Sequence, residues 1–298
     1  MYTNKYQLLA YFREMSQKNL IEIQRKENDY KKQAALINAG IKKLREQMIC
    51  EMLYNTRINR WGNEMILNSV LMITYVSDIV MLEARNHVWP YEYMAFARRI
   101  GELWEVFCRE IFHYPIRELT LIQPPMFHEI QDRLTYNTQK YINDLPVDSA
   151  TKRELQYYYR VPWSIVDSGG VKLDLDLHFM QNGINYNCDF KSGFSSNEKG
   201  NTNRLLSVAS IYRFIGDNQR TILFVRQKEE QNNHYLQTLK NSPYWEVYCA
   251  DEAYRKISEF TGFDIRKWLD RNALWVNDIS EDLREHLRKS DLLKYLTW

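Results

Sequence analysis

A two-residue turn, Asn182-Gly183, separates two runs of alternating polar and apolar residues and restricts the fold of this chain more than any other sequence feature. Type I′ turns need positive φ at both central residues, which asparagine and glycine adopt most easily. The dipeptide therefore predicts a β-hairpin. With these two residues as the loop, the register places Asp176 opposite Asp189.

The predicted hairpin has one polar and one apolar face, because side chains alternate along each strand. The polar face carries Asp174, Asp176, His178, Asn187, Asp189 and Lys191, and the apolar face carries Leu173, Leu175, Leu177, Cys188 and Phe190. Two carboxylates opposed on antiparallel strands repel each other unless a cation lies between them. We therefore expect a cation held by Asp176 and Asp189.

Magnesium suits this pair, because it binds one or two carboxylates together with water and substrate phosphate and needs neither histidine nor cysteine. We expect Mg²⁺, with Mn²⁺ able to replace it. Lys191 lies on the same face as Asp189, so its ammonium group can orient an attacking water or stabilise charge on a phosphate. The alternative is a solvated polar face with an Asp174–Lys191 ion pair, which leaves Asp176 and Asp189 in repulsion. His178 either supports this site or is an ordinary surface histidine.

These residues resemble the PD-(D/E)XK nuclease superfamily, in which one strand carries an aspartate and the next carries an acid-x-lysine motif followed by a helix. The acid-x-lysine motif here is DFK at residues 189–191, and Asp176 is the best match for the earlier aspartate. The sequence departs from the family pattern because Leu175, not proline, precedes Asp176, which leaves Asp174 as a competing metal ligand. The resemblance covers residues 163–260.

The resemblance implies a magnesium-dependent endonuclease that hydrolyses phosphodiester bonds of double-stranded DNA, and a type II restriction enzyme in particular. A site-specific cutter of duplex DNA with one such site per chain is expected to act as a homodimer. One alternative is another nuclease of the superfamily, such as a junction resolvase or a repair nuclease. The other is a non-catalytic DNA-binding or scaffold protein. A large helical region beside one catalytic hairpin, without helicase or methylase motifs, favours restriction.

Members of this superfamily often add an acidic residue from a helix that precedes the sheet. The segment 101–112 has an apolar stripe, and Glu105 lies on the flank of that stripe. Glu105 is therefore the expected third acid, and Glu102, Glu110 and Glu154 compete with it. An ordinary surface glutamate is the alternative interpretation of each.

The loop after the lysine strand contains small, amide and basic side chains and leads into a helix. Thr202 or Asn203 is expected to cap that helix, whose N-terminal amide groups suit a phosphate. Lys199 and Arg204 can neutralise phosphates, and Asn201 and Asn203 can reach base edges. We expect this loop to bind DNA, with an ordinary polar loop as the alternative.

Residues 148–298 alternate between strands and helices and form the expected nuclease core with its C-terminal helices. Strands are predicted at 161–166, 171–179, 184–192, 220–225 and 244–250, and helices at 149–160, 201–216, 233–239 and 251–260. This order predicts an α/β protein of the α+β type, with helices flanking a mixed sheet. The resemblance implies the restriction-endonuclease-like form of that sheet. Asp148 or Ser149 is expected to cap the first helix.

Residues 1–147 form the other predicted unit, a helical region for dimerisation, DNA embrace or both. Helices are predicted at 5–54 with a break at Ala39-Gly40, at 64–83 and at 91–112, and connecting structure with short helices at 113–147. Within residues 5–60, 12 basic residues exceed 6 acidic ones. This excess is typical of a DNA- or subunit-binding arm and equally of an ordinary solvated helix.

The composition gives no sign of a membrane protein or of a disulfide-linked secreted protein. The 40 Lys and Arg residues nearly balance the 38 Asp and Glu residues, so no overall field favours a nucleic acid or a membrane. Any basic surface must be local, and no membrane partner is expected. The four cysteines lie far apart, which predicts reduced thiols and a cytoplasmic protein. The segment 65–82 predicts a buried helix rather than a membrane span, because polar residues interrupt it. Packing rather than base stacking is expected of Tyr157-Tyr158-Tyr159, Trp245, Trp268, Trp275 and Trp298.

Overall fold

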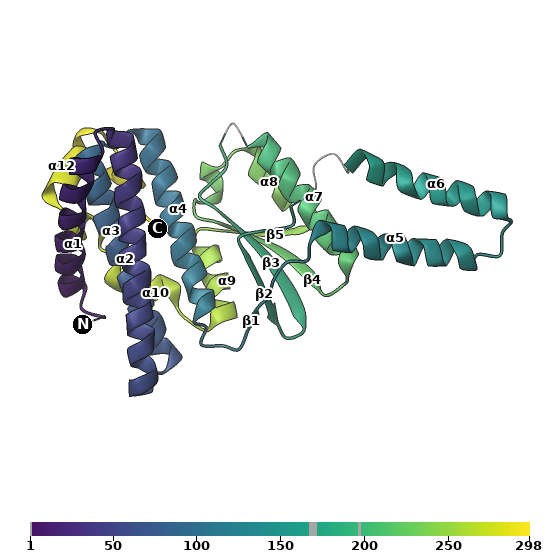
Figure 1. Cartoon of the computed structure of the whole chain (residues 1–298), viewed down its shortest axis with the longest axis horizontal. Coiled ribbons are helices and arrows are strands. Elements are labelled where there is room, and N and C mark those ends of the chain that lie inside the picture. The colour runs from purple at the N-terminus through teal and green to yellow at the C-terminus, as the bar shows by residue number, and fades with distance from the viewer. Residues whose placement is uncertain (1, 167–171, 196–197) are drawn as a thin grey trace.

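The computed structural model describes residues 2–166, 172–195 and 198–298. A bundle of long helices lies at one end of the molecule, a sheet lies in the middle, and an arm of two helices projects at the other end (Figure 1). Both chain termini lie at the helical end. This arrangement confirms the predicted mixed α/β class with long N-terminal helices.

The sheet has five strands in the order β1-β2-β3-β4-β5. Their bounds are Thr120–Leu121 (β1), Leu177–Gln181 (β2), Ile184–Lys191 (β3), Gln219–Val225 (β4) and Trp245–Cys249 (β5). β1, β2 and β3 pair antiparallel, whereas β3, β4 and β5 pair parallel. Parallel neighbours need crossover connections, which α7 (Lys199–Ile215) and α8 (His234–Lys240) supply. The mixed sheet is as predicted.

The hairpin of β2 and β3 has the predicted loop and register. Asn182 and Gly183 have φ values of 52° and 75°, as a two-residue turn of this type requires. Leu177 pairs with Cys188, and the pairing continues in step to the loop. The turn residues alone were sufficient to predict this part of the structure.

The predicted pairing of the two aspartates is wrong, because the strand that should carry them begins later. The ladder starts at Leu177 rather than at residue 171, which lies outside the described residues. Residues 172–176 precede the ladder, so neither Asp174 nor Asp176 has a cross-strand partner in it.

The two faces of the sheet are covered by different helices. One face packs against α4 (Tyr93–His113) and α9 (Asp251–Thr261), and the other packs against α7 and α8. The first face buries Leu177, Phe179, Cys188, Phe190, Ile222 and Phe224, and the second buries Leu223 and Val225. Leu173 and Leu175 join the second cluster, not the first as predicted, because they precede the ladder and do not follow its alternation.

The helical end is built on three long helices, α1 (Lys5–Lys26), α2 (Tyr30–Asn59) and α3 (Asn63–Val88), which pack against one another. The predicted break at Gly40 is wrong, since α2 continues through it. The chain breaks earlier, where Asp29 caps α2 by accepting two backbone N–H groups. One glycine inside a helix costs only about 1 kcal/mol, which is too little to end a helix of this length.

α3 is the apolar segment that was expected to be a buried helix. By length and composition it could cross a membrane, but 83% of its most apolar window is buried inside the protein. The fully buried Asp78 of α3 lies 3.4 Å from a guanidinium nitrogen of Arg45 in α2. α3 is therefore the central helix of the bundle, as in a soluble protein.

Helices α5 (Phe127–Asp144) and α6 (Ser149–Val166) form the projecting arm in Figure 1. The prediction of short helices within 113–147 and of a strand at 161–166 is wrong, because α5 has 18 residues and α6 continues to Val166. Periodicity alone does not separate helix from strand in short apolar runs. Asp148 accepts two backbone N–H groups at the start of α6, as predicted.

After β5 and α9 the chain returns to the helical end. The elements there are α10 (Ile265–Asn272), α11 (Trp275–Asp278), α12 (Glu281–Lys289) and a short 3-10 turn at Leu293–Tyr295; another 3-10 turn, Glu229–Gln231, lies between β4 and α8. α12 packs against α3, and Asp278 accepts hydrogen bonds from Tyr75 and Lys5, each at 2.8 Å. The predicted boundary at residue 147 thus falls inside the arm, and the last helices pack with the first ones.

The aromatic residues divide into two groups. Trp245, Trp268 and Trp275 are buried, and Trp298 packs against the ring of Trp275, as expected of packing residues. Tyr157 and Tyr158 are 64% and 62% exposed on the arm. Packing into a core is therefore the wrong prediction for these two tyrosines, whose rings contact each other on the surface of the arm. All four cysteines are free, as predicted.

Candidate active site

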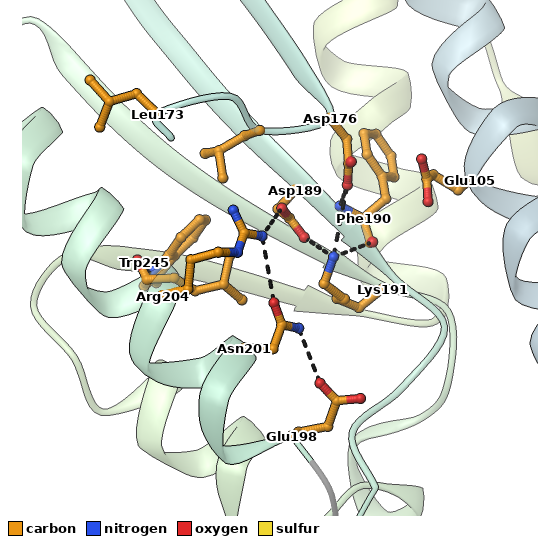
Figure 2. Close-up of polar contacts among 12 residues, drawn as sticks. Glu105, Leu173, Asp176, Asp189, Phe190, Lys191, Glu198, Asn201, Arg204 and Trp245 are labelled. Carbon is orange, nitrogen blue, oxygen red and sulfur yellow. Dashed lines mark hydrogen bonds and ion pairs between the residues drawn. The ribbon is translucent and has the colours of Figure 1, made fainter. Parts of the chain in front are cut away.

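The end of β3 carries two of the predicted site residues, Asp189 and Lys191, on the face of the sheet that packs against α7 (Figure 2). Asp189 lies beside Leu223 of β4 and is only 1% exposed. The ammonium group of Lys191 contacts its Oδ1 atom. A carboxylate buried to this degree is not part of a solvated polar face, so the simpler interpretation of the hairpin does not hold.

Asp176 reaches the same place from the segment before β2. Its Oδ2 atom accepts a hydrogen bond from the Phe190 N–H at 2.7 Å and lies 4.0 Å from Nζ of Lys191. The same Nζ donates to the Phe190 carbonyl oxygen at 3.2 Å. Two carboxylates and one carbonyl group therefore converge on the ammonium group of Lys191, as Figure 2 shows.

His178 fixes the segment that carries Asp176. Its Nε2 atom accepts a hydrogen bond from the Leu175 N–H at 3.1 Å, and its Nδ1 atom lies 2.8 Å from Oδ1 of Asn187. Nδ1 is assigned the proton, because an amide oxygen only accepts. Burial lowers the pKa of His178, so the ring is neutral at pH 7. The prediction of a surface histidine is wrong, because this ring is buried and connects two parts of the hairpin.

The pKa values of Asp189 and Lys191 are both raised, by burial for the acid and by neighbouring charges for the lysine. Burial raises the pKa of Asp189, against the opposing effect of Lys191, and the charge of Asp176 adds to the rise. Burial alone would lower the pKa of Lys191, but the charges of Asp189 and Asp176 outweigh it and raise that pKa. Lys191 is therefore an ammonium ion at neutral pH, which donates hydrogen bonds and does not accept a proton from water.

Glu105 of α4 lies on the other side of Asp176 (Figure 2). Burial raises the pKa of Glu105, and the charge of Asp176 adds to this effect. An ion pair with Arg109 at 3.0 Å acts in the opposite direction. The predicted third acid is thus brought next to the first one.

The three competitors of Glu105 lie elsewhere. Glu102 pairs with two arginines of its own helix at 2.8 and 3.0 Å. Glu110 acts electrostatically on Asp78 in the helical bundle, and Glu154 is exposed on the arm. Of the four glutamates, Glu105 is the one that the fold brings to the hairpin.

The competing first ligand, Asp174, is exposed. In the described part of the chain, the acidic partners of Lys191 are Asp189 and Asp176, so the structure favours Asp176 over Asp174. No group of three or more His, Cys, Asp or Glu side chains among the described residues is arranged to hold a metal ion. The oxygen groups gathered around Lys191 are two carboxylates and the Phe190 carbonyl group.

Helix α7 begins at Lys199, earlier than predicted. The predicted DNA-binding residues therefore lie in its first two turns rather than in a loop; they are Lys199, Asn201, Asn203 and Arg204. The position before it is occupied by Glu198, so the prediction that Thr202 or Asn203 caps this helix is wrong. Residues 196 and 197 of the predicted loop lie outside the described structure. Lys199 and Asn203 are exposed and face solvent.

Arg204 turns toward the hairpin instead, and Asn201 contacts Arg204. Nη2 of Arg204 lies 3.3 Å from Oδ2 of Asp189 and 3.5 Å from Oδ1 of Asn201 (Figure 2). Asn201 also donates to Glu198 at 3.0 Å. Arg204 therefore belongs to the carboxylate cluster itself, a contact that its position in the sequence did not reveal.

Sequence reasoning also missed the part played by the backbone of Phe190. Its N–H holds Asp176 and its carbonyl oxygen faces Lys191. Main-chain groups are present at every position, so no residue type signals them.

Comparison of the chain with protein-family models, curated proteins and solved structures finds no match. The geometry of the site is therefore the basis for assigning a function.

Proposed function

We propose that this chain is a magnesium-dependent endonuclease that hydrolyses phosphodiester bonds of double-stranded DNA, and most specifically a type II restriction enzyme of the PD-(D/E)XK superfamily. The observation that carries the proposal is the convergence of Asp176, Asp189 and the Phe190 carbonyl on one ammonium group. The order of the core supports it too, because an antiparallel hairpin with the acids is followed by a helix and a parallel strand.

The residues present fit a hard divalent cation. Asp176, Asp189 and the Phe190 carbonyl oxygen would hold Mg²⁺ or Mn²⁺, which prefer oxygen ligands and a small number of carboxylates. The repulsion between the carboxylates, at present offset by Lys191, is the electrostatic reason why a cation binds there. When bound, the ion would supply charge neutralisation at a phosphate oxygen.

The chain's own residues supply the rest of the chemistry. The water oxygen forms a bond to phosphorus while the bond from phosphorus to the leaving sugar oxygen breaks. Lys191 is protonated, so it donates a hydrogen bond to the water or to a phosphate oxygen. Glu105, whose pKa burial raises, accepts the water proton, and the leaving oxygen takes a proton from solvent.

DNA binding is assigned to the start of α7. Lys199 and Asn203 face solvent there, and Arg204 is 40% exposed although it pairs with Asp189. These groups can contact phosphates on either side of the cleaved bond. Because each chain has one such site, cutting both strands calls for a homodimer, and a restriction role places the protein in the cytoplasm with DNA as its partner.

The test is cleavage of plasmid DNA in Mg²⁺ by the wild type and by Lys191→Met. We expect the variant to bind DNA but to cut about 10²–10³ times more slowly, the usual loss when one charge-stabilising donor is removed. Lys289→Met is the matched control, because Lys289 is exposed on α12, remote from the sheet. A wild-type protein that nicks no DNA with either Mg²⁺ or Mn²⁺ contradicts the proposal, and leaves DNA binding without catalysis as the remaining function.

A further inference from the structure

We infer that Gly101 is a positioning residue of this site, because its missing side chain lets α4 touch the end of β3 and so places Glu105 beside Asp176. This inference rests on the proposed function and names a residue that the acid-x-lysine motif does not contain. Gly101 is buried inside α4, far from either end of the helix.

The contact between α4 and β3 leaves no room for a side chain. A Cβ atom added at Gly101 would lie 2.5 Å from Cβ and 2.8 Å from Oγ of Ser192. Both distances are shorter than carbon and oxygen atoms approach without displacement. Ser192 directly follows Lys191, and Gly101 precedes Glu105 by four residues, which puts it on the same face of the helix.

Ser192 is held by Arg226 and has little freedom to yield. Its Oγ atom accepts hydrogen bonds from Nε and Nη2 of Arg226 at 3.0 and 2.9 Å. Nη1 of Arg226 donates to the Thr297 carbonyl oxygen at 2.9 Å. The backbone N–H of Arg226 also donates to the Lys191 carbonyl at 2.9 Å, so this arginine fixes both residues at the end of β3.

Helix α4 is also held in place close to Gly101. The indole N–H of Trp298 donates to the carbonyl oxygen of Ile100 at 3.3 Å. Trp104 packs edge-on against Phe190, with ring centroids 5.9 Å apart, and donates to the Tyr254 hydroxyl at 2.9 Å. A group inserted between Gly101 and this end of β3 therefore meets resistance from both sides and moves the helix relative to the strand.

The cost of glycine in a helix makes this position informative. Glycine inside a helix is less favourable than alanine. A buried glycine in the middle of a helix is therefore expected mainly where a side chain does not fit. Gly40 in α2 is a comparison within the same chain. A Cβ atom there would have Asn19 Nδ2 as its nearest neighbour at 3.5 Å, an ordinary contact.

The experiment is a double-mutant cycle of Gly101→Ala and Ser192→Gly, with Gly40→Ala as control. In the double variant the two close atoms of Ser192 are gone, and the nearest atom left is its Cα at 3.7 Å. We measure single-turnover plasmid nicking in Mg²⁺, DNA affinity without metal, and the melting temperature. Gly101→Ala should slow nicking at least tenfold, leave DNA affinity unchanged and lower the melting temperature.

When Gly101→Ala is added to the Ser192→Gly variant, the nicking rate should stay unchanged and the melting temperature should rise. Gly40→Ala should have the same two effects in the wild type. Equal nicking by Gly101→Ala and wild type overturns the inference. So does a loss that persists in the Ser192→Gly background, or a double variant that does not fold. If the wild type cuts no DNA, the proposed function fails and no catalytic role for Gly101 stands; the melting temperatures then decide only the steric claim.

Discussion

Lys191 shows how burial and charge together decide what one residue can do. An exposed lysine beside two aspartates would be a weak surface ion pair. Here Asp189 is almost fully buried, and Lys191 stays protonated because two carboxylates surround it. Its role is therefore that of a fixed positive charge. That Asp176, Asp189 and Lys191 lie together could be predicted from the sequence, because the Asn-Gly turn and the alternation along the strands bring these positions to one end of the hairpin.

The route by which Asp176 arrives was not predictable at the residue scale. The alternation of the sequence indicates a strand through residue 176, whereas the Phe190 N–H and the His178 ring hold this segment off the ladder. Both contacts involve backbone groups. Residue type carries no information about which backbone groups meet.

His178 gives a pH-dependent prediction. Burial lowers its pKa in the folded protein below the value of about 6.5 expected in the unfolded chain. The unfolded chain then binds more protons below that pH, so the contribution is full above about pH 6.5 and is lost as the pH falls. The free energy of unfolding should decrease below pH 6.5 by at most about 1.4 kcal/mol per pH unit from this group.

Urea unfolding at several pH values checks this prediction. His178→Gln should flatten the slope between pH 6.5 and 5, and His128→Gln, at an exposed position on α5, should not. A wild-type slope in the His178→Gln variant would show that this ring is not the group that titrates.

At the scale of elements, strong local sequence signals predicted the secondary structure correctly, and weak ones did not. Asn182-Gly183 fixed the hairpin and its register, since its φ values have few alternatives. The break at Gly40 and the strand at 161–166 were wrong because propensity and short apolar runs are outweighed by neighbouring helix. The cap of α2 at Asp29 is the signal that would have placed the break.

The contact between α2 and α3 contains a buried ionisable pair, Arg45 and Asp78. Burial raises the pKa of Asp78 to about 7, although Arg45 acts against it, and its Oδ2 atom has no hydrogen-bond partner. The folded protein then binds more protons than the unfolded chain, so stability is greatest below about pH 4 from this group and decreases as the pH rises toward 7. Asp78→Asn keeps an oxygen for Arg45 and removes this cost.

We expect Asp78→Asn to increase the free energy of unfolding at pH 8 by up to about 4 kcal/mol, and to have little effect near pH 4. Chemical denaturation at both pH values measures the difference. Asp132→Asn is the control, because Asp132 is exposed on the arm. A destabilised Asp78→Asn protein at pH 8 would mean that the charged pair contributes more than its burial costs.

At the scale of the whole molecule, the sequence predicted a helical part and a sheet but not how they join. The C-terminal helices pack with the N-terminal ones. The arm of α5 and α6 projects from the sheet (Figure 1), and the start of α5 packs under the sheet through Ile130. Such placements follow from long-range packing rather than from local pattern. The result that matters for function is that α4 links the two parts, since it packs in the bundle and carries Glu105 to the sheet.

The proposed activity requires that Asp176, Asp189 and the Phe190 carbonyl bind a divalent cation. The most direct measurement is an anomalous difference map from crystals soaked in Mn²⁺. We predict one strong peak between these groups, at about 2.0–2.2 Å from an oxygen of each carboxylate, which is lost in Asp189→Asn. A map with no peak at this position, or with its strongest peak remote from the end of β3, would contradict the proposed cation site.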